Sequence, residues 1–227
     1  MRTVAAEGLC KLLLNDRIKS PNLVSHLLIM WYNPVTEGDV YLRQMLGAFF
    51  TTLAYDSQNG QEALEQAFLP TLRTLFQAPV TSPLVEVDQD SVVRLLLNLT
   101  RPDINKSSVH NNLAVALCNE ILLDSDPYNI QVLLRALTQL QLVLDDEIVL
   151  QNISTVVEKV AESIKDRSCL RYIHKFQHML ASGKFSLTRS GTTANMETPT
   201  GSSVITNVDQ QTVNSPEVIC CCLSKVT

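Results

Sequence analysis

The stretch that decides the fold is Leu9–Phe50, LCKLLLNDRIKSPNLVSHLLIMWYNPVTEGDVYLRQMLGAFF. Three apolar segments follow one another in it at helical spacing, and only turn signals separate them. Ser20-Pro21 and Asn33-Pro34 mark the two breaks, because proline is favoured in the first turn of a helix but cannot continue an existing one. The stretch therefore predicts three successive helices joined by short turns, with Ser20 as the N-cap of the second.

The same pattern continues as far as residue 182. Further helices are expected at about residues 60–77, 88–99, 108–123, 127–142, 145–164 and 166–182. Helices of this length joined by short turns are typical of a HEAT-type α-solenoid, in which antiparallel helix pairs stack and bury their apolar faces against neighbours. The first helix, from about residue 2, resembles the second member of such a pair. The sequence thus predicts an all-α solenoid over residues 1–182, the C-terminal part of a longer array.

Three local expectations accompany this prediction. Thr36 and Asp39 look like a capping-box pair at the start of the third helix, and the spacing of Asp39 and Arg43 resembles the acidic and basic positions of a HEAT second helix. Asp88 is the expected cap of the helix over residues 88–99. The leucine-rich segment 133–144, LLRALTQLQLVL, is too short for coiled-coil heptads and predicts a buried helix.

Residues 183–227 have a different composition. They are rich in Ser, Thr, Gly, Asn and Gln and contain few large apolar side chains, so they cannot offset the entropy of ordering, and we expect a disordered tail. Thr198-Pro199 and Ser215-Pro216 in this tail are candidate sites for proline-directed phosphorylation. The consecutive Cys220–Cys222 have no nearby His or Cys that would complete a zinc site, and their role stays open.

Composition and motifs exclude several function classes. The net charge of −5 is not that of a basic nucleic-acid-binding protein, and no apolar run approaches the ~18 residues that span a bilayer. With no signal peptide either, the chain is expected to be intracellular and free of membranes. No Gly-rich phosphate loop, GxSxG or HExxH motif is present, so we expect no catalysis, no cofactor and no small-molecule substrate.

The histidines do not form a metal motif. His26 and His110 lie far apart in the sequence, whereas His174 and His178 have the i, i+4 spacing of metal ligands. No helix motif supplies a third ligand, so no metal site is predicted.

The last predicted helix carries a basic stripe, formed by Arg167, Arg171 and Lys175 together with His174 and His178. An apolar set follows the same rhythm two residues away, which is about 200° around a helix: Cys169, Ile173, Phe176 and Leu180. The basic stripe is thus expected opposite the buried one. It is either a contact for DNA phosphate or an acidic partner, or the polar outer face of a terminal repeat.

Trp31 is the single tryptophan and stands beside the Asn33-Pro34 turn. It could be an exposed anchor for a partner peptide. The alternative, which we favour, is that it packs where one helix ends against the next repeat.

Several segments together resemble one known family. LCKLLLN, LLIMWYNPVTEGDVYLRQMLGAFF, AFLPTLRTLFQAPVTSPL and LLLNLTRPD are similar to the C-terminal HEAT region of the condensin complex subunit 3 family, also called the chromosome-associated protein G family. The resemblance covers most of residues 1–181. A generic HEAT or armadillo scaffold of transport or phosphatase-regulatory type is the alternative class.

The resemblance implies a non-catalytic subunit of a complex with two SMC ATPases and a kleisin. Members of this family bind the kleisin and DNA and act in mitotic chromosome condensation, which implies a nuclear and chromosomal location with a cytoplasmic pool. The chain departs from the family in lacking the larger N-terminal part of the array and the long basic tail, in place of which stands TVNSPEVICCCLSKVT. Weak or no DNA binding is therefore expected of this chain alone.

Overall fold

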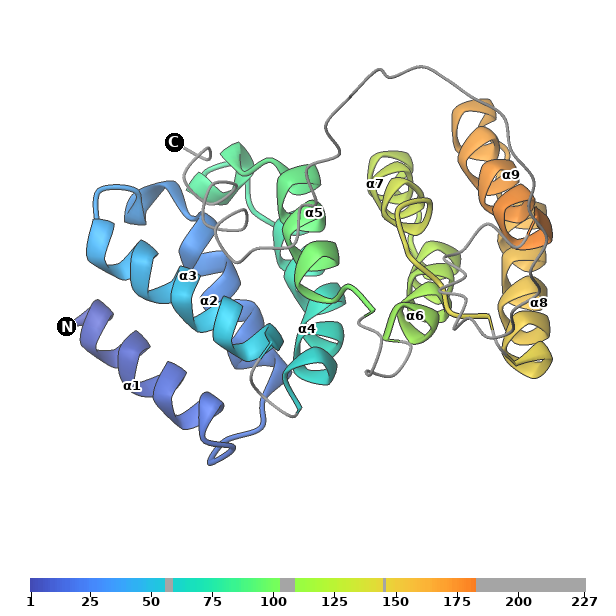
Figure 1. The fold of residues 1–227 in the computed structure, drawn as a ribbon. Helices are drawn as coiled ribbons and strands as arrows, with labels where there is room; N and C mark the ends of the chain where they lie inside the picture. Colours follow the sequence, from blue (N-terminus) through green and yellow to red (C-terminus); the bar gives the residue numbers. More distant parts are fainter. Residues whose placement is uncertain (56–58, 103–108, 145, 183–227) are drawn as a thin grey trace, which may run out of the picture. The chain divides into compact units, whose positions relative to one another are not determined.

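The computed structural model describes residues 1–55, 59–102, 109–144 and 146–182 (Figure 1). These residues form α-helices and two short 3-10 turns, and they contain no β-strand. The α-helices are α1 (Arg2–Leu14), α2 (Pro21–Tyr32), α3 (Val40–Tyr55), α4 (Gly60–Phe76), α5 (Gln89–Leu99), α6 (Val109–Leu123), α7 (Pro127–Leu137), α8 (Glu147–Ser163) and α9 (Arg167–Ser182). The 3-10 turns are η1 (Pro34–Thr36) and η2 (Pro83–Glu86).

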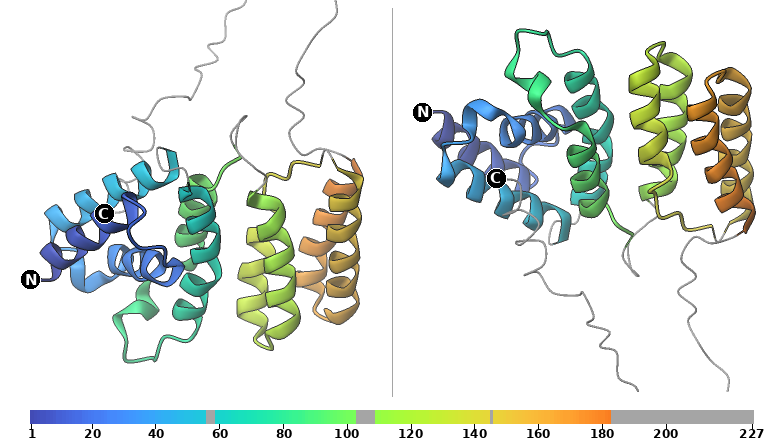
Figure 2. Two further views of the ribbon diagram at one scale, coloured as in Figure 1. Left: turned by 90° about the horizontal axis from the view of Figure 1, so that it is seen from below. Right: turned by 90° about the horizontal axis from the view of Figure 1, so that it is seen from above.

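The helices stack in two layers. Each odd-numbered helix contacts the next odd-numbered one, from α1 to α9, and each even-numbered helix contacts the next even-numbered one, from α2 to α8. The pairs α2–α3, α4–α5, α6–α7 and α8–α9 pack across the layers (Figure 2). This packing confirms the predicted all-α solenoid, and it places α1 in the layer of second helices.

Short side-chain caps explain where most helices begin. Ser20 Oγ accepts a hydrogen bond from the Leu23 N–H at 3.3 Å, as predicted. Asp88 Oδ1 accepts from the Asp90 N–H at 3.2 Å, which confirms the cap of α5. Each bond satisfies one of the N–H groups that a helix start leaves without a partner.

The expected capping box at α3 is wrong. Asp39 alone caps this helix, because its Oδ1 accepts from the Leu42 N–H at 3.0 Å. The Thr36 hydroxyl instead donates to two backbone carbonyls of the preceding turn, at 2.6 and 2.8 Å. The other carboxylate oxygen of Asp39 accepts from Thr3 Oγ1 at 2.9 Å, so it links α1 to α3.

Trp31 belongs to the core. Only 8% of its surface is exposed, and its ring stacks on Phe50 with a centroid distance of 5.4 Å. The alternative of an exposed anchor is therefore wrong, and the tryptophan holds the end of α2 against α3.

The helix predicted over residues 127–142 ends earlier, at Leu137. Beyond that point the backbone forms hydrogen bonds to two side chains of α6. Asn111 Nδ2 donates to the Val143 carbonyl at 2.6 Å, and Asn111 Oδ1 accepts from the Val143 N–H at 3.0 Å. His110 Nδ1 accepts from the Gln141 N–H at 2.9 Å. These bonds replace the intrahelical ones, so the segment is buried as predicted but only its first part is helical.

None of the described helices combines the length and the apolar content needed to cross a lipid bilayer. The predicted tail over residues 183–227, with Thr198, Ser215 and Cys220–Cys222, lies outside the described residues.

Candidate interaction surfaces

The α9 stripe has the geometry that the sequence predicted. Arg167, Arg171 and Lys175 are exposed, and so are His174 and His178. The four apolar side chains on the opposite face are buried: Cys169, Ile173, Phe176 and Leu180.

Asp166 sets the start of α9 and so positions this stripe. Its carboxylate accepts hydrogen bonds from the Ser168 hydroxyl and, at 2.9 Å, from the Cys169 N–H. These two bonds lower the pKa of the Asp166 carboxyl to about 2, so the cap stays ionised at neutral pH.

The three cations of the stripe form no ion pairs within the described part of the chain. The ion pairs found there involve other side chains: Lys11–Glu7, Arg73–Glu120, Arg94–Asp88 and Arg135–Asp90. Arg167, Arg171 and Lys175 therefore keep their charges available to an external anion. No group of three or more His, Cys, Asp or Glu side chains lies close enough together to hold a metal ion in the described ranges.

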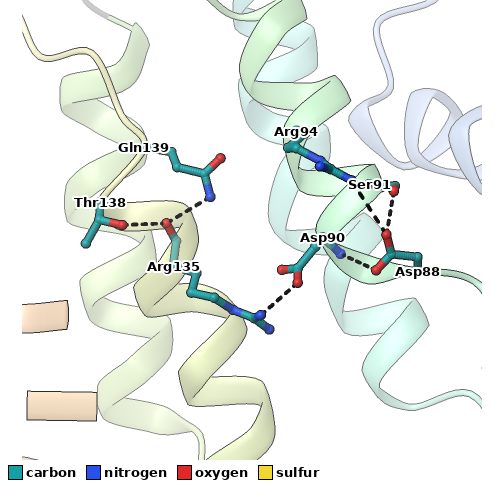
Figure 3. Close-up of polar contacts among 7 residues, drawn as sticks. All are labelled: Asp88, Asp90, Ser91, Arg94, Arg135, Thr138 and Gln139. Atoms are coloured by element: carbon teal, nitrogen blue, oxygen red, sulfur yellow. Dashed lines mark hydrogen bonds and ion pairs between the residues drawn. The ribbon is translucent and has the colours of Figure 1, made fainter. Parts of the chain in front are cut away.

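Charged pairs connect successive repeats within each layer. Arg135 of α7 contacts Asp90 of α5 at 2.8 Å, and the two side chains are only 30% and 37% exposed (Figure 3). In the other layer, Arg73 of α4 holds Glu120 of α6 through two hydrogen bonds, the Nε bond being 2.7 Å long. Two-point arginine–carboxylate pairs of this kind fix geometry as well as adding energy. No motif in the sequence marks any of these four residues.

A second set of links is buried and uncharged. Gln61 Nε2 donates to the Ala54 carbonyl at 2.9 Å and to the Leu99 carbonyl at 2.8 Å, and so joins the ends of α3 and α5 to α4. Burying a carbonyl without a hydrogen bond costs free energy, and this one amide group removes that cost for two carbonyls.

His110 is the centre of a third buried link. Its Nδ1 accepts from the Gln141 N–H, so the proton of the neutral ring is on Nε2, which lies 3.1 Å from Thr100 Oγ1. The Thr100 hydroxyl in turn donates to the Leu96 carbonyl at 2.8 Å. Burial lowers the pKa of His110 to about 4, so the ring is neutral at physiological pH. A histidine that the sequence left without a role thus ties α5, α6 and the segment after α7 together.

A pocket of about 290 Å³ lies beside this link. It opens between the end of α5 and the segment that follows α7. The side chains that line it are Arg94, Leu97, Asn98, Arg101, His110, Gln139 and Gln141. All but one of these are polar, and two are arginines, so the pocket suits an anionic or hydrogen-bonding group better than an apolar ligand.

Comparison with known proteins identifies the family of this chain. The family model for the C-terminal domain of nuclear condensing complex subunits matches residues 1–142. The chain is 42% identical over 194 residues to condensin complex subunit 3 of Homo sapiens and 40% identical over 195 residues to that of Xenopus laevis. Each alignment covers 81% of this chain and 19% of the relative, so the chain spans about a fifth of the relatives' length. The matches confirm the resemblance noted in the sequence, and the chain belongs to the family of nuclear condensing complex subunits.

Proposed function

We propose that this chain acts as a non-catalytic, regulatory HEAT-repeat subunit of the condensin complex in mitotic chromosome condensation. The observation that carries this proposal is the family match over residues 1–142, together with more than 40% identity to condensin complex subunit 3 of Homo sapiens. A stack of helix pairs offers extended surfaces for other proteins, which is how solenoids commonly work.

The proposed partners are the kleisin subunit and the SMC ATPases of condensin. In this assignment the ATPase subunits do the chemistry, and this chain contributes binding surfaces. The proposed location is the nucleus and mitotic chromosomes, with a cytoplasmic pool.

DNA is proposed as a partner of the complex, with weak or no binding by this chain alone. The α9 stripe of Arg167, Arg171 and Lys175 is the proposed point of direct contact, because its charges are exposed and have no ion-pair partners among the described residues. Three cations on a chain of net charge −5 favour a contact that supplements stronger sites elsewhere in the complex.

Co-purification tests the complex directly. The tagged chain would be expressed in mitotic cells, and the proteins bound to it would be identified by mass spectrometry. We expect SMC and kleisin subunits to be recovered together. Recovery of transport or phosphatase subunits instead, or of no condensin subunit when tagged full-length condensin complex subunit 3 captures them in parallel, would contradict the proposal.

A further inference from the structure

We propose that the pocket between α5 and the segment after α7 binds an extended acidic peptide. The pocket is formed by residues that neither the sequence motifs nor the family match assign to a function. The proposal does not depend on the complex in which the chain acts.

The pocket contains two arginines that are available to carboxylates. The Arg94 side chain is 63% exposed, donates to Ser91 Oγ at 3.0 Å and lies 3.8 Å from Asp88. A contact that long between exposed groups is weak, so a carboxylate can displace it. Arg101 is exposed and forms no ion pair with any of the residues described. Guanidinium groups bind carboxylates through two parallel hydrogen bonds, which a point charge cannot do.

The amide side chains of the pocket suit a peptide backbone. Asn98 and Gln141 make no side-chain hydrogen bond to the described residues, and Gln139 uses only its Nε2, which donates to the Arg135 carbonyl at 3.2 Å. Figure 3 shows the Gln139 amide directed from the end of α7 toward α5. Amides offer a donor and an acceptor side by side, as an extended main chain does, so they can pair with it whatever its sequence.

His110 and Leu97, which also line the pocket, take no part in binding charge. Both ring nitrogens of His110 are occupied, one by the Gln141 N–H and the other by Thr100. Leu97 beside it is buried. At about 290 Å³ the pocket is at the small end of ligand sites, so it holds a short stretch of chain rather than a folded element.

Acidic groups next to the pocket favour a peptide over duplex DNA. Asp88 is 62% exposed and Asp90 37% exposed, and both lie at the start of α5 on the Arg94 side (Figure 3). A duplex carries a phosphate for about every 1.7 Å of its axis and would bring several of them against these carboxylates. A peptide can place its acidic residues at the two arginines and neutral residues beside the aspartates.

The test is an anisotropy titration of the full chain with a fluorescein-labelled nonapeptide of alternating Glu and Ser. We expect the Arg94→Gln/Arg101→Gln variant to bind this peptide at least tenfold more weakly, and Asn98→Ala to weaken binding by a few fold. The matched control, Arg17→Gln/Lys19→Gln, changes the net charge equally but lies between α1 and α2, and we expect it to bind as the unaltered chain does. All five side chains are exposed, so circular dichroism should show unchanged helix content.

A charge exchange makes the test specific. Arg94→Glu/Arg101→Glu should lose the glutamate peptide and bind a nonapeptide of alternating Lys and Ser. The proposal is wrong if the unaltered chain does not bind the glutamate peptide, or if the Arg17→Gln/Lys19→Gln control loses as much affinity as the pocket variant. It is equally wrong if a labelled 20-base-pair duplex binds more tightly than the peptide and loses that affinity in the pocket variant, because the pocket is then a DNA contact.

Discussion

At the scale of single residues, Asn111 has a larger role than its position in the sequence indicates. The Asn111 side chain is only 5% exposed. It bonds both the N–H and the carbonyl of Val143, as a backbone partner in a helix or sheet would. The amide thus satisfies the partly buried N–H and carbonyl of Val143 at once, in a segment that is no longer helical.

Replacing Asn111 with alanine should lower the free energy of unfolding by about 2 to 4 kcal/mol, because it leaves the N–H and the carbonyl of Val143 without partners. Urea unfolding measures the change, and hydrogen exchange should show reduced protection of the Val143 amide. Asn119→Ala, at an exposed position of the same helix, is the control and should change little. Equal stability of the two variants would contradict the assigned role.

His110 should make stability depend on pH. Its ordinary pKa of 6.5 is restored on unfolding, whereas in the folded chain the pKa is about 4. As pH falls from 6.5 to 4, protons bind the unfolded chain in preference, so the free energy of unfolding decreases, by up to about 3 kcal/mol. Well above pH 6.5 both states are neutral at this residue, and the effect is absent.

Urea unfolding at pH 7, 6 and 5 measures this effect. The His110→Gln variant should show a smaller loss of stability between pH 7 and 5 than the unaltered chain, whereas His26→Gln, at an exposed position, should follow the unaltered chain. An identical pH profile for His110→Gln would show that other groups cause the loss.

At the scale of elements, α9 combines a structural face with a charged one. Ile173 and Phe176 are fully buried, and the basic side chains point away from them. Substitution of the basic residues therefore leaves the packing of α9 on α7 and α8 intact. This separation lets the charged face be tested without unfolding the helix.

Reversing Arg167, Arg171 and Lys175 to Glu should abolish any DNA binding by this chain. Two to four phosphate contacts predict weak, sequence-independent binding, with a slope of about −2 to −4 for log K against log salt concentration. Anisotropy titrations with a labelled duplex at two salt concentrations measure both quantities. Tight binding that ignores salt would contradict this prediction.

The control for this reversal changes three exposed cations elsewhere to Glu: Arg17, Lys19 and Lys159. It alters the net charge by the same amount. If it weakens DNA binding as much as the α9 reversal does, the effect comes from net charge and not from the stripe.

At the scale of the whole molecule, we expect the boundary near residue 182 to separate a protected array from an accessible tail. The composition of residues 183–227 gives this prediction. Limited proteolysis followed by mass spectrometry should leave a stable fragment ending close to Ser182. A protected core that included residues 192–216 would place the boundary elsewhere.

Much of the array was predictable from the sequence because its determinants are local. Ser20, Asp88 and the proline positions mark helix starts within a few residues, and apolar periodicity assigns the buried face of each helix. The stripe on α9 followed from spacing alone, since a helix converts residue numbers directly into angles. Sequence similarity to known family members supplied the family.

The features that only the tertiary structure decided all depend on groups far apart in the chain. Helix α7 ends at Leu137, and beyond it the backbone of Val143 is bonded by Asn111, which lies 32 residues earlier in the chain. The pairing of Arg135 with Asp90 depends on which repeats stack, as does the pocket beside His110. Periodicity predicts the face of a helix on which a residue lies. It does not specify which residue of another repeat contacts it, because that depends on how the layers pack.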